Sequence, residues 1–486
     1  MSVQGTAVAW PRPARSDQQP LALWDSATLA AATGGKSSND FQVSGAEIDS
    51  RDVQAGDLFF ALQGENTDGH RFLGKAFENG AVAAVVDRPV SYPHILVEDT
   101  TVALRAIAEA SRQRAEATIV GVTGSVGKTG VKEAIFAALE RSSRGRAHRS
   151  VKSYNNHIGV PLSLARMAPR SKYGVFEMGM NHAGEIAALT AQVRPHVAVI
   201  TTIAPAHIEM LGSEEGIADA KAEIFEGLQP GGTAVIPADN PHFARLRAAA
   251  ERAGAKVAAF GRSDHANVRL LDTVPVAHGG SLVTAELGSR RLCYTVAEPG
   301  EHWIANSLAV LAAVEAAGGD LGSAGLALAE MGGLKGRGAR HRIPVPGGTA
   351  LIIDESYNAN PASMRATLGQ LGATPASRRI AVLGSMKELG DFGPAFHAQL
   401  AGPIGDAGVD YAILVGEEMG PLARELSNRG RSALGSGLHF DHCPDFTAAI
   451  AALEEFGLTG GDAVLVKGSN SMKLAGLVEY FTAREG

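Results

Sequence analysis

Residues 117–135 read ATIVGVTGSVGKTGVKEAI, an apolar run followed by a glycine-rich loop and a helix-forming stretch. Proteins hold nucleotide phosphates with backbone N–H groups at a helix N-terminus and with one ammonium, and glycines let the backbone come close to the phosphate oxygens. Gly124, Gly127 and Lys128 meet these needs, and the Thr129 hydroxyl follows where Mg²⁺ is expected. The stretch therefore predicts a nucleotide phosphate site between a strand and a helix of an α/β fold.

The loop is shorter than the usual phosphate-binding loop, which has four residues between its two glycines. Val122 stands where the first of those glycines would be, so the loop consists of residues 124–129. A glycine-rich turn with an incidental lysine is the alternative interpretation. The apolar run before the loop and the helical pattern after it argue against that alternative.

The length and composition of the chain predict a soluble enzyme of several domains. The chain has 486 residues, which is too long for one core and suggests about three domains. Its net charge of -7 gives no overall basic field, so we expect no extended nucleic-acid partner. Cys293 and Cys443 lack the spacing of a metal or redox site, which suits a reducing compartment. No apolar run reaches the roughly 18 residues of a membrane span and residues 1–20 lack a secretory signal, so we expect a cytoplasmic protein with a loose N-terminal tail.

Three α/β regions are expected along the chain. Residues 21–116 form a small α/β domain, and residues 117–334 form a central domain with a mostly parallel sheet. Residues 335–486 form a third, Rossmann-like unit, which follows a glycine-rich stretch at 332–338 that is expected to be a hinge. The expected helices are 25–33, 72–79 and 214–228, and the expected strands are 58–62, 82–86, 173–178, 197–203, 350–354, 379–383, 411–415 and 463–466.

Glu177 closes the apolar run 173–176 and is therefore expected at the carboxyl end of a core strand. Ligand-binding groups gather at this edge of an open α/β sheet. With the Thr129 hydroxyl, the Glu177 carboxylate can complete a hard-oxygen site for Mg²⁺. A solvated glutamate at a strand end is the alternative that this residue alone leaves open.

His207 and Lys221 are further candidates for a metal site. His207 follows the expected strand 197–203, and Lys221 lies on the apolar stripe of the next helix, four residues from both Ile217 and Phe225. Burying an ammonium is costly, so this amine should tend toward neutrality, and a neutral amine can take up CO₂ to become a carbamate. The carbamate is an oxygen ligand for Mg²⁺. A lysine that extends its head past the stripe to solvent is the alternative.

Polar loops near the N-terminus suggest a second ligand-binding region. Ser50, Arg51 and the run 64–70 flank the expected strand 58–62. An arginine among polar residues at strand ends suits a diphosphate or a uracil ring.

Several motifs in a fixed order resemble those of the Mur ligases, the ATP-dependent amide-forming enzymes of peptidoglycan assembly. The resemblance extends from about residue 50 to the C-terminus, and the number and order of its motifs make it specific. The motifs are the loop at 123–129, NNHIGVP at 155–161, IAPAH at 203–207, DESYNANP at 354–361, LGSMKELG at 383–390 and KGS at 467–469.

The resemblance implies an amino-terminal UDP-sugar-binding domain, a central P-loop ATPase domain and a carboxyl-terminal Rossmann-like ligase domain. It implies a cytoplasmic enzyme of cell-wall synthesis, expected as a monomer, that uses ATP and two Mg²⁺ ions. The implied reaction joins D-Ala-D-Ala to UDP-N-acetylmuramoyl-tripeptide through an acyl phosphate.

The resemblance also implies roles for individual residues. Lys128, Lys221, His207 and Arg340 would be catalytic. Thr129 and Glu177 would hold one Mg²⁺, and His207 with a carbamylated Lys221 would hold the second. The nucleotide-binding set is Thr123, Gly124, Ser125, Val126, Gly127, Lys128, Thr129, His302, Asn306, Arg340, Asp354 and Glu355. The substrate-binding set is Ser50 and Arg51 for the UDP part, Asn155 and Asn156 for the muramyl-peptide, and Tyr357, Asn358 and Asn360 at the interface of the central and carboxyl-terminal domains.

One departure from the family pattern leaves the identity of the phosphate-contacting arginine open. Ala339 precedes Arg340 where the family has glycine, whereas Arg337 follows Gly336. Arg337 is therefore a rival for this role.

Other departures are substitutions within the motifs. Gly130 follows Thr129 and should weaken the start of its helix by roughly 0.5–1 kcal/mol relative to alanine. Trp303 stands where an asparagine often follows the histidine. Glu355 and Ser385 each replace an aspartate, and Asn470 replaces an arginine. None of these changes removes a proposed metal ligand.

Two other functions were weighed against this prediction. A related ligase, either the one that adds the third residue or a folylpolyglutamate synthetase, fits less well because of the run 357–361 and the Ser50-Arg51 region. A regulatory nucleotide-binding protein without catalysis fits less well because Lys128, Glu177 and the other expected catalytic residues are present.

Overall fold

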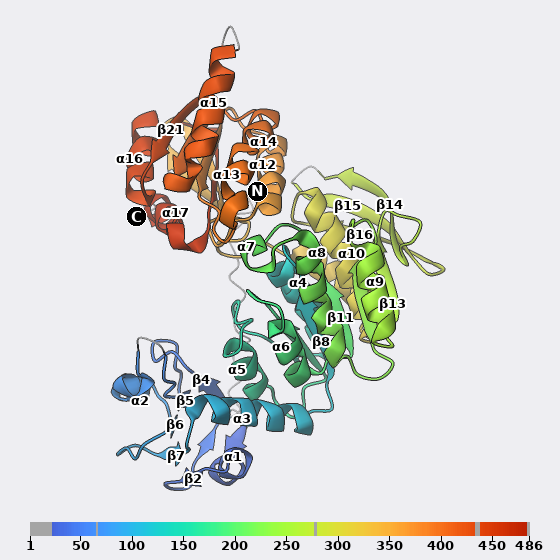
Figure 1. The fold of residues 1–486 in the computed structure, drawn as a ribbon, viewed down its shortest axis with the longest axis vertical. Coiled ribbons are helices and arrows are strands. Elements are labelled where there is room, and N and C mark those ends of the chain that lie inside the picture. Colours follow the sequence, from blue (N-terminus) through green and yellow to red (C-terminus); the bar gives the residue numbers. More distant parts are fainter. Residues whose placement is uncertain (1–21, 65–66, 277–278, 433–437, 484–486) are drawn as a thin grey trace.

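The computed structural model describes residues 22–64, 67–276, 279–432 and 438–483. Sheets of five, nine and six strands follow one another along the chain, each with its own helices (Figure 1). In Figure 1 the N-terminal sheet lies at the bottom, and the carboxyl-terminal sheet lies at the top beyond the central one. The α/β class and the three successive α/β units expected from the sequence are confirmed.

The N-terminal sheet has the order β2-β7-β6-β5-β4, in which β4 to β7 are parallel and β2 is antiparallel to β7. Every residue of β5 and β6 is buried, so these strands form the centre of the domain. A separate antiparallel pair is formed by β1 and β3. The bounds are β1 Trp24–Asp25, α1 Ser26–Thr33, β2 Lys36–Ser37, β3 Gln42–Val43, β4 Gly45–Glu47, β5 Asp57–Phe60, η1 Gly69–Phe72, α2 Leu73–Glu78, β6 Ala83–Val86, β7 His94–Leu96 and α3 Thr100–Arg114.

The central sheet has the order β16-β15-β14-β13-β12-β11-β8-β10-β9. It is parallel from β9 to β14 and antiparallel at its β14–β15 and β15–β16 pairs. The strands are β8 Thr118–Thr123, β9 Ala147–Arg149, β10 Tyr173–Glu177, β11 Val197–Ile200, β12 Thr233–Pro237, β13 Lys256–Gly261, β14 Val268–Pro275, β15 Ser281–Leu287 and β16 Arg290–Val296.

Helices cover both faces of the central sheet and bury a hydrophobic cluster on each. One cluster includes residues of α4, α10 and α11, and the other includes residues of α5, α6, α8 and α9. The helices are α4 Lys128–Ser143, α5 Gly159–Ala165, α6 Glu185–Val193, α7 Ile208–Leu211, α8 Glu214–Ala222, η2 Glu223–Gly227, α9 Phe243–Arg252, α10 Glu301–Ala316 and α11 Leu321–Glu330.

The carboxyl-terminal sheet has the order β17-β18-β22-β19-β20-β21 and is parallel except for the β17–β18 pair. The strands are β17 Ala339–Val345, β18 Gly348–Glu355, β19 Arg379–Gly384, β20 Tyr411–Val415, β21 His439–Cys443 and β22 Ala463–Lys467. The helices are α12 Pro361–Ala373, η3 Gly390–Phe392, α13 Gly393–Ala398, α14 Ala401–Asp406, η4 Glu417–Met419, α15 Gly420–Ser432, α16 Phe446–Phe456, η5 Asn470–Met472 and α17 Ala475–Thr482.

The helix expected at 214–228 is divided in the structure. It is α-helical over α8 and continues as the 3₁₀ turn η2. Thr190 Oγ1 donates a hydrogen bond to the Ile224 carbonyl, and a Cβ on Gly227 would lie 2.4 Å from the Thr190 carbonyl oxygen. The close approach of α6 therefore accompanies the tighter turn, which the apolar stripe alone could not reveal.

The register of the central strands brings the predicted site together. Glu177 of β10 pairs with Val122 of β8, and Ile200 of β11 pairs with Thr123. Because the three strands are parallel, their carboxyl ends meet at one edge of the sheet, directly before the phosphate loop.

Candidate active site

A cavity of about 300 Å³ lies between the central and carboxyl-terminal domains. Most of the residues predicted to bind nucleotide or metal contribute to its wall. The predicted residues that line it are Ser125, Val126, Gly127, Lys128, Asn155, Glu177, His207, Lys221, His302, Asn306, Glu355, Tyr357, Asn358 and Asn360. The structure therefore brings together motifs that are far apart in the sequence.

The phosphate loop forms the floor of this cavity. Gly124 has φ +144°, and a Cβ there would lie 1.9 Å from Thr201 Oγ1, so only glycine fits against β11. Gly127 has φ +86° and immediately precedes the first residue of α4. The free N–H groups of the first turn of α4 are thereby available to an anion.

Lys128 is folded back over the loop. Its Nζ donates a hydrogen bond of 2.7 Å to the Gly124 carbonyl. Burial lowers the pKa of Lys128, Glu177 opposes this effect, and the positive charge of Arg337 adds to it. A bound polyphosphate would supply negative charge that balances the positive charges of Lys128 and Arg337.

Thr129 and Glu177 meet beneath the cavity, as the sequence predicts. Thr129 Oγ1 lies 2.8 Å from Glu177 Oε2, and Asn155 Nδ2 donates to Glu177 Oε1 at 2.9 Å. The Glu177 residue is 0 % exposed, so a solvated glutamate is excluded. A hydroxyl beside a fixed carboxylate fits the ligand preference of Mg²⁺.

The donor set limits how many metal ligands the chain itself can provide. Within the ranges that the structure describes, no three His, Cys, Asp or Glu side chains gather as a metal site. Mg²⁺ typically binds one or two protein oxygens and completes its octahedron with water and substrate phosphates. The Thr129–Glu177 pair fits that pattern better than a closed, all-protein site.

His207 lies at the opposite wall and contacts the carboxyl-terminal domain. It adopts a left-handed conformation with φ +61°, and its Nδ1 lies 2.5 Å from Glu388 Oε2. The His207 ring is therefore in direct contact with the Glu388 carboxylate, and this contact lowers the pKa of Glu388. The backbone of Glu209 also donates to the Glu388 carbonyl, so the two domains are in contact here.

Lys221 is buried in α8 with its head toward the cavity. The residue is 1 % exposed and lines the cavity, which excludes a lysine that extends into solvent. Burial and the nearby charge of Lys128 lower its pKa well below the ordinary value, and Glu223 offsets this only in part. A lowered pKa favours the uncharged amine, which is the form that carbamate formation requires.

The glycine-rich stretch at 332–338 is a compact turn in this structure. Asp354 Oδ2 accepts a hydrogen bond of 2.8 Å from the Gly336 N–H, and its carbonyl accepts one from Gly338. A Cβ on Gly333 would lie 2.0 Å from the Gly338 carbonyl oxygen. The turn is therefore closed on itself and anchored to β18.

This turn directs Arg337 into the cavity. The guanidinium lies 4.0 Å from the centre of the Tyr357 ring, and Nη2 donates to Ser153 Oγ at 3.1 Å. Arg340, on β17, is exposed and does not line the cavity, and its charge faces Glu298. The geometry favours Arg337 over Arg340 as the arginine nearest to a bound phosphate.

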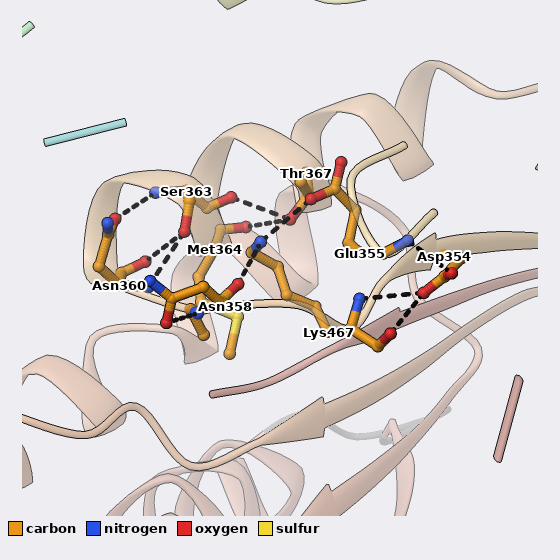
Figure 2. A network of polar contacts seen from close by, with 11 residues as sticks. Asp354, Glu355, Asn358, Asn360, Ser363, Met364, Thr367 and Lys467 are labelled. Carbon is orange, nitrogen blue, oxygen red and sulfur yellow. Dashed lines mark hydrogen bonds and ion pairs between the residues drawn. The ribbon is translucent and has the colours of Figure 1, made fainter. Parts of the chain in front are cut away.

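The loop after β18 is held by a polar network (Figure 2). Lys467 Nζ reaches Glu355 Oε2 at 3.2 Å and donates to the Asn358 carbonyl at 3.0 Å. Asn360 caps α12 through a reciprocal pair of hydrogen bonds with Ser363. The residues between them are thereby fixed at the cavity wall.

The start of α10 packs against the phosphate loop. A Cβ on Gly127 would lie 2.9 Å from Asn306 Nδ2, so Asn306 and the loop are in direct contact. Burial lowers the pKa of His302, which lines the cavity. Trp303 also lines it and faces Gly130, a contact that joins two of the family departures noted in the sequence.

Eight of the predicted nucleotide- or substrate-binding residues do not line the cavity: Ser50, Arg51, Thr123, Gly124, Thr129, Asn156, Arg340 and Asp354. Ser50 is buried in the N-terminal domain and its carbonyl accepts a hydrogen bond from Asn79. Arg51 is exposed and pairs with Asp49 at 2.5 Å. The Asn156 side chain accepts hydrogen bonds from the N–H groups that begin α5, and Asp354 anchors the turn.

Sequence reasoning gave no role to several residues that line the cavity, among them Ser153, Asn181 and Lys467. Lys467 lies in a recognised motif, so its position was a usable signal. Ser153 lies two positions before the motif at 155–161, and Asn181 lies four positions after Glu177. Nothing in the sequence around either residue distinguishes it from a surface residue.

Glu298 provides a pH-dependent probe of this region. Burial and the charge of Glu355 raise its pKa to about 7, against the opposing charge of Arg340. The folded protein therefore holds this proton more tightly than the unfolded chain, and stability falls as the pH rises from about 4.3 toward 7. Glu298→Gln, which stays neutral, should exceed the wild type in stability by ~3 kcal/mol at pH 8 and by only ~1 kcal/mol at pH 5. Thermal unfolding midpoints at both pH values check this, and a difference that does not change with pH would contradict it.

No helix in the described part of the chain combines the length and apolar character of a membrane span.

Three family models match successive parts of the chain. They are "Mur ligase family, catalytic domain" over residues 42–123, "Mur ligase middle domain" over 122–314 and "Mur ligase, glutamate ligase domain" over 341–470. Together they include the phosphate loop, α10 and the network of Figure 2.

Curated relatives match over nearly the whole chain. The UDP-N-acetylmuramoyl-tripeptide–D-alanyl-D-alanine ligase of Synechocystis sp. is 36% identical, covering 92% of this chain and 93% of the relative. The enzyme of the same name from Escherichia coli is 34% identical over 90% and 94%, respectively.

Solved structures give the same result. MurF from Acinetobacter baumannii superposes with a TM-score of 0.80 at 28% identity, covering 96% of this chain and 100% of that one. The MurF ligase from Thermotoga maritima in complex with ADP has a TM-score of 0.72 at 25% identity, covering 90% and 97%.

Proposed function

Because the chain belongs to the Mur ligase family, we propose that it joins D-Ala-D-Ala to UDP-N-acetylmuramoyl-tripeptide at the expense of ATP. The chain is an ATP-dependent ligase of peptidoglycan synthesis. One observation carries this conclusion on the structural side: the phosphate loop and the Tyr357–Asn360 loop open into the same cavity. The substrates follow from the names of the full-length relatives.

The reaction requires two consecutive displacements. A carboxylate oxygen of the tripeptide attacks the γ-phosphorus of ATP. The bond between the γ-phosphorus and the oxygen that bridges it to the β-phosphorus breaks, which gives an acyl phosphate and ADP. The amine of D-Ala-D-Ala then attacks the acyl carbon, phosphate leaves and the amine loses a proton. Both steps depend on positioning and charge neutralisation and need no nucleophile from the protein.

We assign the neutralising charges to Lys128 and Arg337. Lys128 is fixed on the phosphate loop, whereas Arg337 comes from the turn that the carboxyl-terminal domain anchors through Asp354. Their mutual repulsion, which lowers the pKa of Lys128, would be relieved by the phosphates of the nucleotide. The site is therefore suited to bind a ligand that brings additional negative charge.

Thr129 and Glu177 are the residues that would hold one Mg²⁺, and His207 with a carbamylated Lys221 would hold a second. Mg²⁺ supplies positive charge beside the transferring phosphoryl group when it is bound. Asn155 and Lys132 keep the Glu177 carboxylate in place, with Lys132 Nζ 3.9 Å from Oε2.

Carbamate formation at Lys221 is supported by its surroundings. The neutral amine nitrogen would attack the carbon of CO₂ and release a proton, giving an anionic group on a buried stem. That anion would then lie close to Lys128, whose charge now disfavours an ammonium at Lys221. Carbamate formation would thus place a negative charge beside the Lys128 ammonium, which is an attractive pair.

The remaining site assignments are proposals for substrate binding. Ser50 and Arg51 would hold the UDP part and Asn155 and Asn156 the muramyl-peptide. Tyr357, Asn358 and Asn360 would position the reacting groups at the interface. The nucleotide would also contact the loop residues from Thr123 to Thr129, His302 and Asn306, with Glu355 nearby.

We further propose three domains at residues 21–116, 117–334 and 335–486, acting as a monomer. We propose a cytoplasmic location, because ATP and UDP-linked precursors are made in that compartment. An ion pair between Lys152 Nζ and Asp52 Oδ2, at 2.5 Å, links the proposed N-terminal and central domains.

The choice between the two arginines gives a direct mutational prediction. Arg337→Ala should lower kcat by roughly 10²–10³-fold because a charge beside the transferring phosphate is lost. Arg340→Ala is the matched control and should change kcat by less than about threefold, since Arg340 lies outside the cavity. Steady-state kinetics of both variants, together with their thermal midpoints, make the comparison. A larger loss for Arg340→Ala would reverse the assignment.

Phosphate release with purified substrates tests the function as a whole. The protein should release phosphate from ATP only when UDP-N-acetylmuramoyl-tripeptide and D-Ala-D-Ala are both present, with the pentapeptide product formed in equal amount. Omission of either substrate is the control. ATP turnover that ignores both substrates would refute a ligase.

A further inference from the structure

Trp303 lies in the cavity but has no part in the reaction described above. It occupies the first turn of α10, between His302 and the buried Ile304. The outer edge of its indole points at Gly130, in the first turn of α4. The first turns of α10 and α4 are therefore in contact through the Trp303 ring and Gly130.

The ring and the glycine depend on each other sterically. A Cβ built on Gly130 would lie 2.6 Å from Trp303 Cη2 and 3.1 Å from Cζ2, which is closer than real contacts allow. Gly130 lies within α4 and does not have a positive φ, so its backbone does not require glycine. A glycine here lowers helix stability, and the space that the indole occupies accounts for its presence.

The position of the ring relative to the phosphate site suggests what it contacts. A polyphosphate bound at the N–H groups of the first turn of α4 passes next to Gly130. Lys128 and the Thr129–Glu177 pair define the phosphate end of the cavity. A nucleoside joined to these phosphates would lie against another part of the wall, and Trp303 and Asn306 belong to the part beside the phosphate loop.

The three other aromatic rings on the wall, those of Tyr357, His302 and His207, are less suitable for stacking with a base, and His207 is already in contact with Glu388. The Tyr357 ring already carries the Arg337 guanidinium at 4.0 Å, and His302 has a far smaller surface. No cation lies over the Trp303 ring among the residues that the structure describes, and its nearest ring neighbour, His302, is tilted with centroids 6.2 Å apart.

We propose that Trp303 is a nucleotide-binding residue that stacks on the base of ATP, and that Gly130 is the glycine that makes room for it. This proposal rests on the proposed function, because it takes ATP as the nucleotide. The contact between Trp303 and Gly130 then accounts for both of these departures from the family pattern.

Binding of ADP and of inorganic pyrophosphate separates the base from the phosphates. Trp303→Leu should weaken ADP binding by about 5- to 100-fold, as expected for the loss of one base–aromatic contact. The same variant should bind pyrophosphate within about twofold of the wild type. Trp303→Phe is the matched control and should retain most of the ADP affinity because it keeps a ring.

Gly130→Ala provides an independent route to the same result. The added methyl group should displace the indole and weaken ADP but not pyrophosphate, and the double variant Gly130→Ala/Trp303→Leu should lose little more than Trp303→Leu alone. Fluorescence gives a third measurement: ADP should change the emission of the wild type, whereas pyrophosphate should not, and the ADP effect should be absent in Trp303→Phe. This comparison needs only the conservative variant and remains available if Trp303→Leu does not fold.

Equal losses for ADP and pyrophosphate, or unchanged ADP affinity in Trp303→Leu, would overturn the stacking role and leave the ligase function standing. An ADP-induced emission change that persists in Trp303→Phe would also overturn it. A wild-type protein that binds neither compound would refute the proposed function itself.

Discussion

Replacing Lys128 by alanine should lower the rate of acyl phosphate formation by at least ~10³-fold. The side chain is held over the phosphate loop by its hydrogen bond to the Gly124 carbonyl, so its charge is already in position before the nucleotide arrives. A preorganised charge acts most strongly where negative charge develops, and it costs no rearrangement during the reaction.

Rate and affinity should therefore respond differently in Lys128→Ala. We expect kcat to fall by a larger factor than the affinity for ADP, because the backbone N–H groups of the loop remain. Lys335→Ala is the matched control: it also removes a lysine near the interface, but Lys335 is exposed and pairs with Glu479. Equal losses of kcat and ADP affinity would indicate a general binding role instead.

The metal end of the site was predictable because sheet topology follows from the sequence pattern. Apolar runs end at Thr123 and at Glu177, and parallel strands bring such ends together. The 2.8 Å contact of Thr129 with Glu177 is the geometric result. The fold class was accessible for the same reason, since alternating strand and helix patterns imply parallel sheets.

The arginine was not predictable from spacing. Arg337 and Arg340 are only three positions apart in the sequence. Their spacing alone does not tell which side chain would reach the phosphates of a bound nucleotide. The side chain of Asp354 binds the Gly336 N–H and closes the turn from which Arg337, unlike Arg340, reaches the cavity wall. Because Asp354 belongs to β18, the sequence around Arg337 does not reveal this contact.

The pairing of Trp303 with Gly130 was hidden for a related reason. In the sequence, each residue is a separate departure from the family, and the glycine appears merely unfavourable for its helix. Only the packing of α10 against α4 reveals that one departure requires the other. Similarly, the break between α8 and η2 is accompanied by a contact with Thr190 of α6, which the periodicity of the helix sequence does not reveal.

Replacing Lys221 by alanine should reduce turnover by at least ~10²-fold, an effect comparable to the loss of other charged groups beside a transferring phosphate. The amine is buried and lines the cavity, and burial together with the charge of Lys128 lowers its pKa. Loss of a merely structural lysine would lower stability, whereas loss of a carbamate should remove activity from a folded protein.

Bicarbonate is the appropriate reagent to test the carbamate. Wild-type activity should decline when CO₂ is removed and return when bicarbonate is added, whereas Lys221→Ala should remain inactive at any bicarbonate concentration. With ¹³C-labelled bicarbonate, the wild type should give a carbamate carbon resonance that is absent from the variant.

The matched control for Lys221 is Lys221→Gln, which keeps most of the length and is neutral like the free amine. If neutrality and packing were sufficient, this variant would be active. The proposed carbamate would instead supply an anion near Lys128, so the glutamine variant should be as inactive as the alanine variant although its thermal midpoint is closer to the wild type. Near-normal turnover of either variant would eliminate the carbamate, because neither alanine nor glutamine can form one.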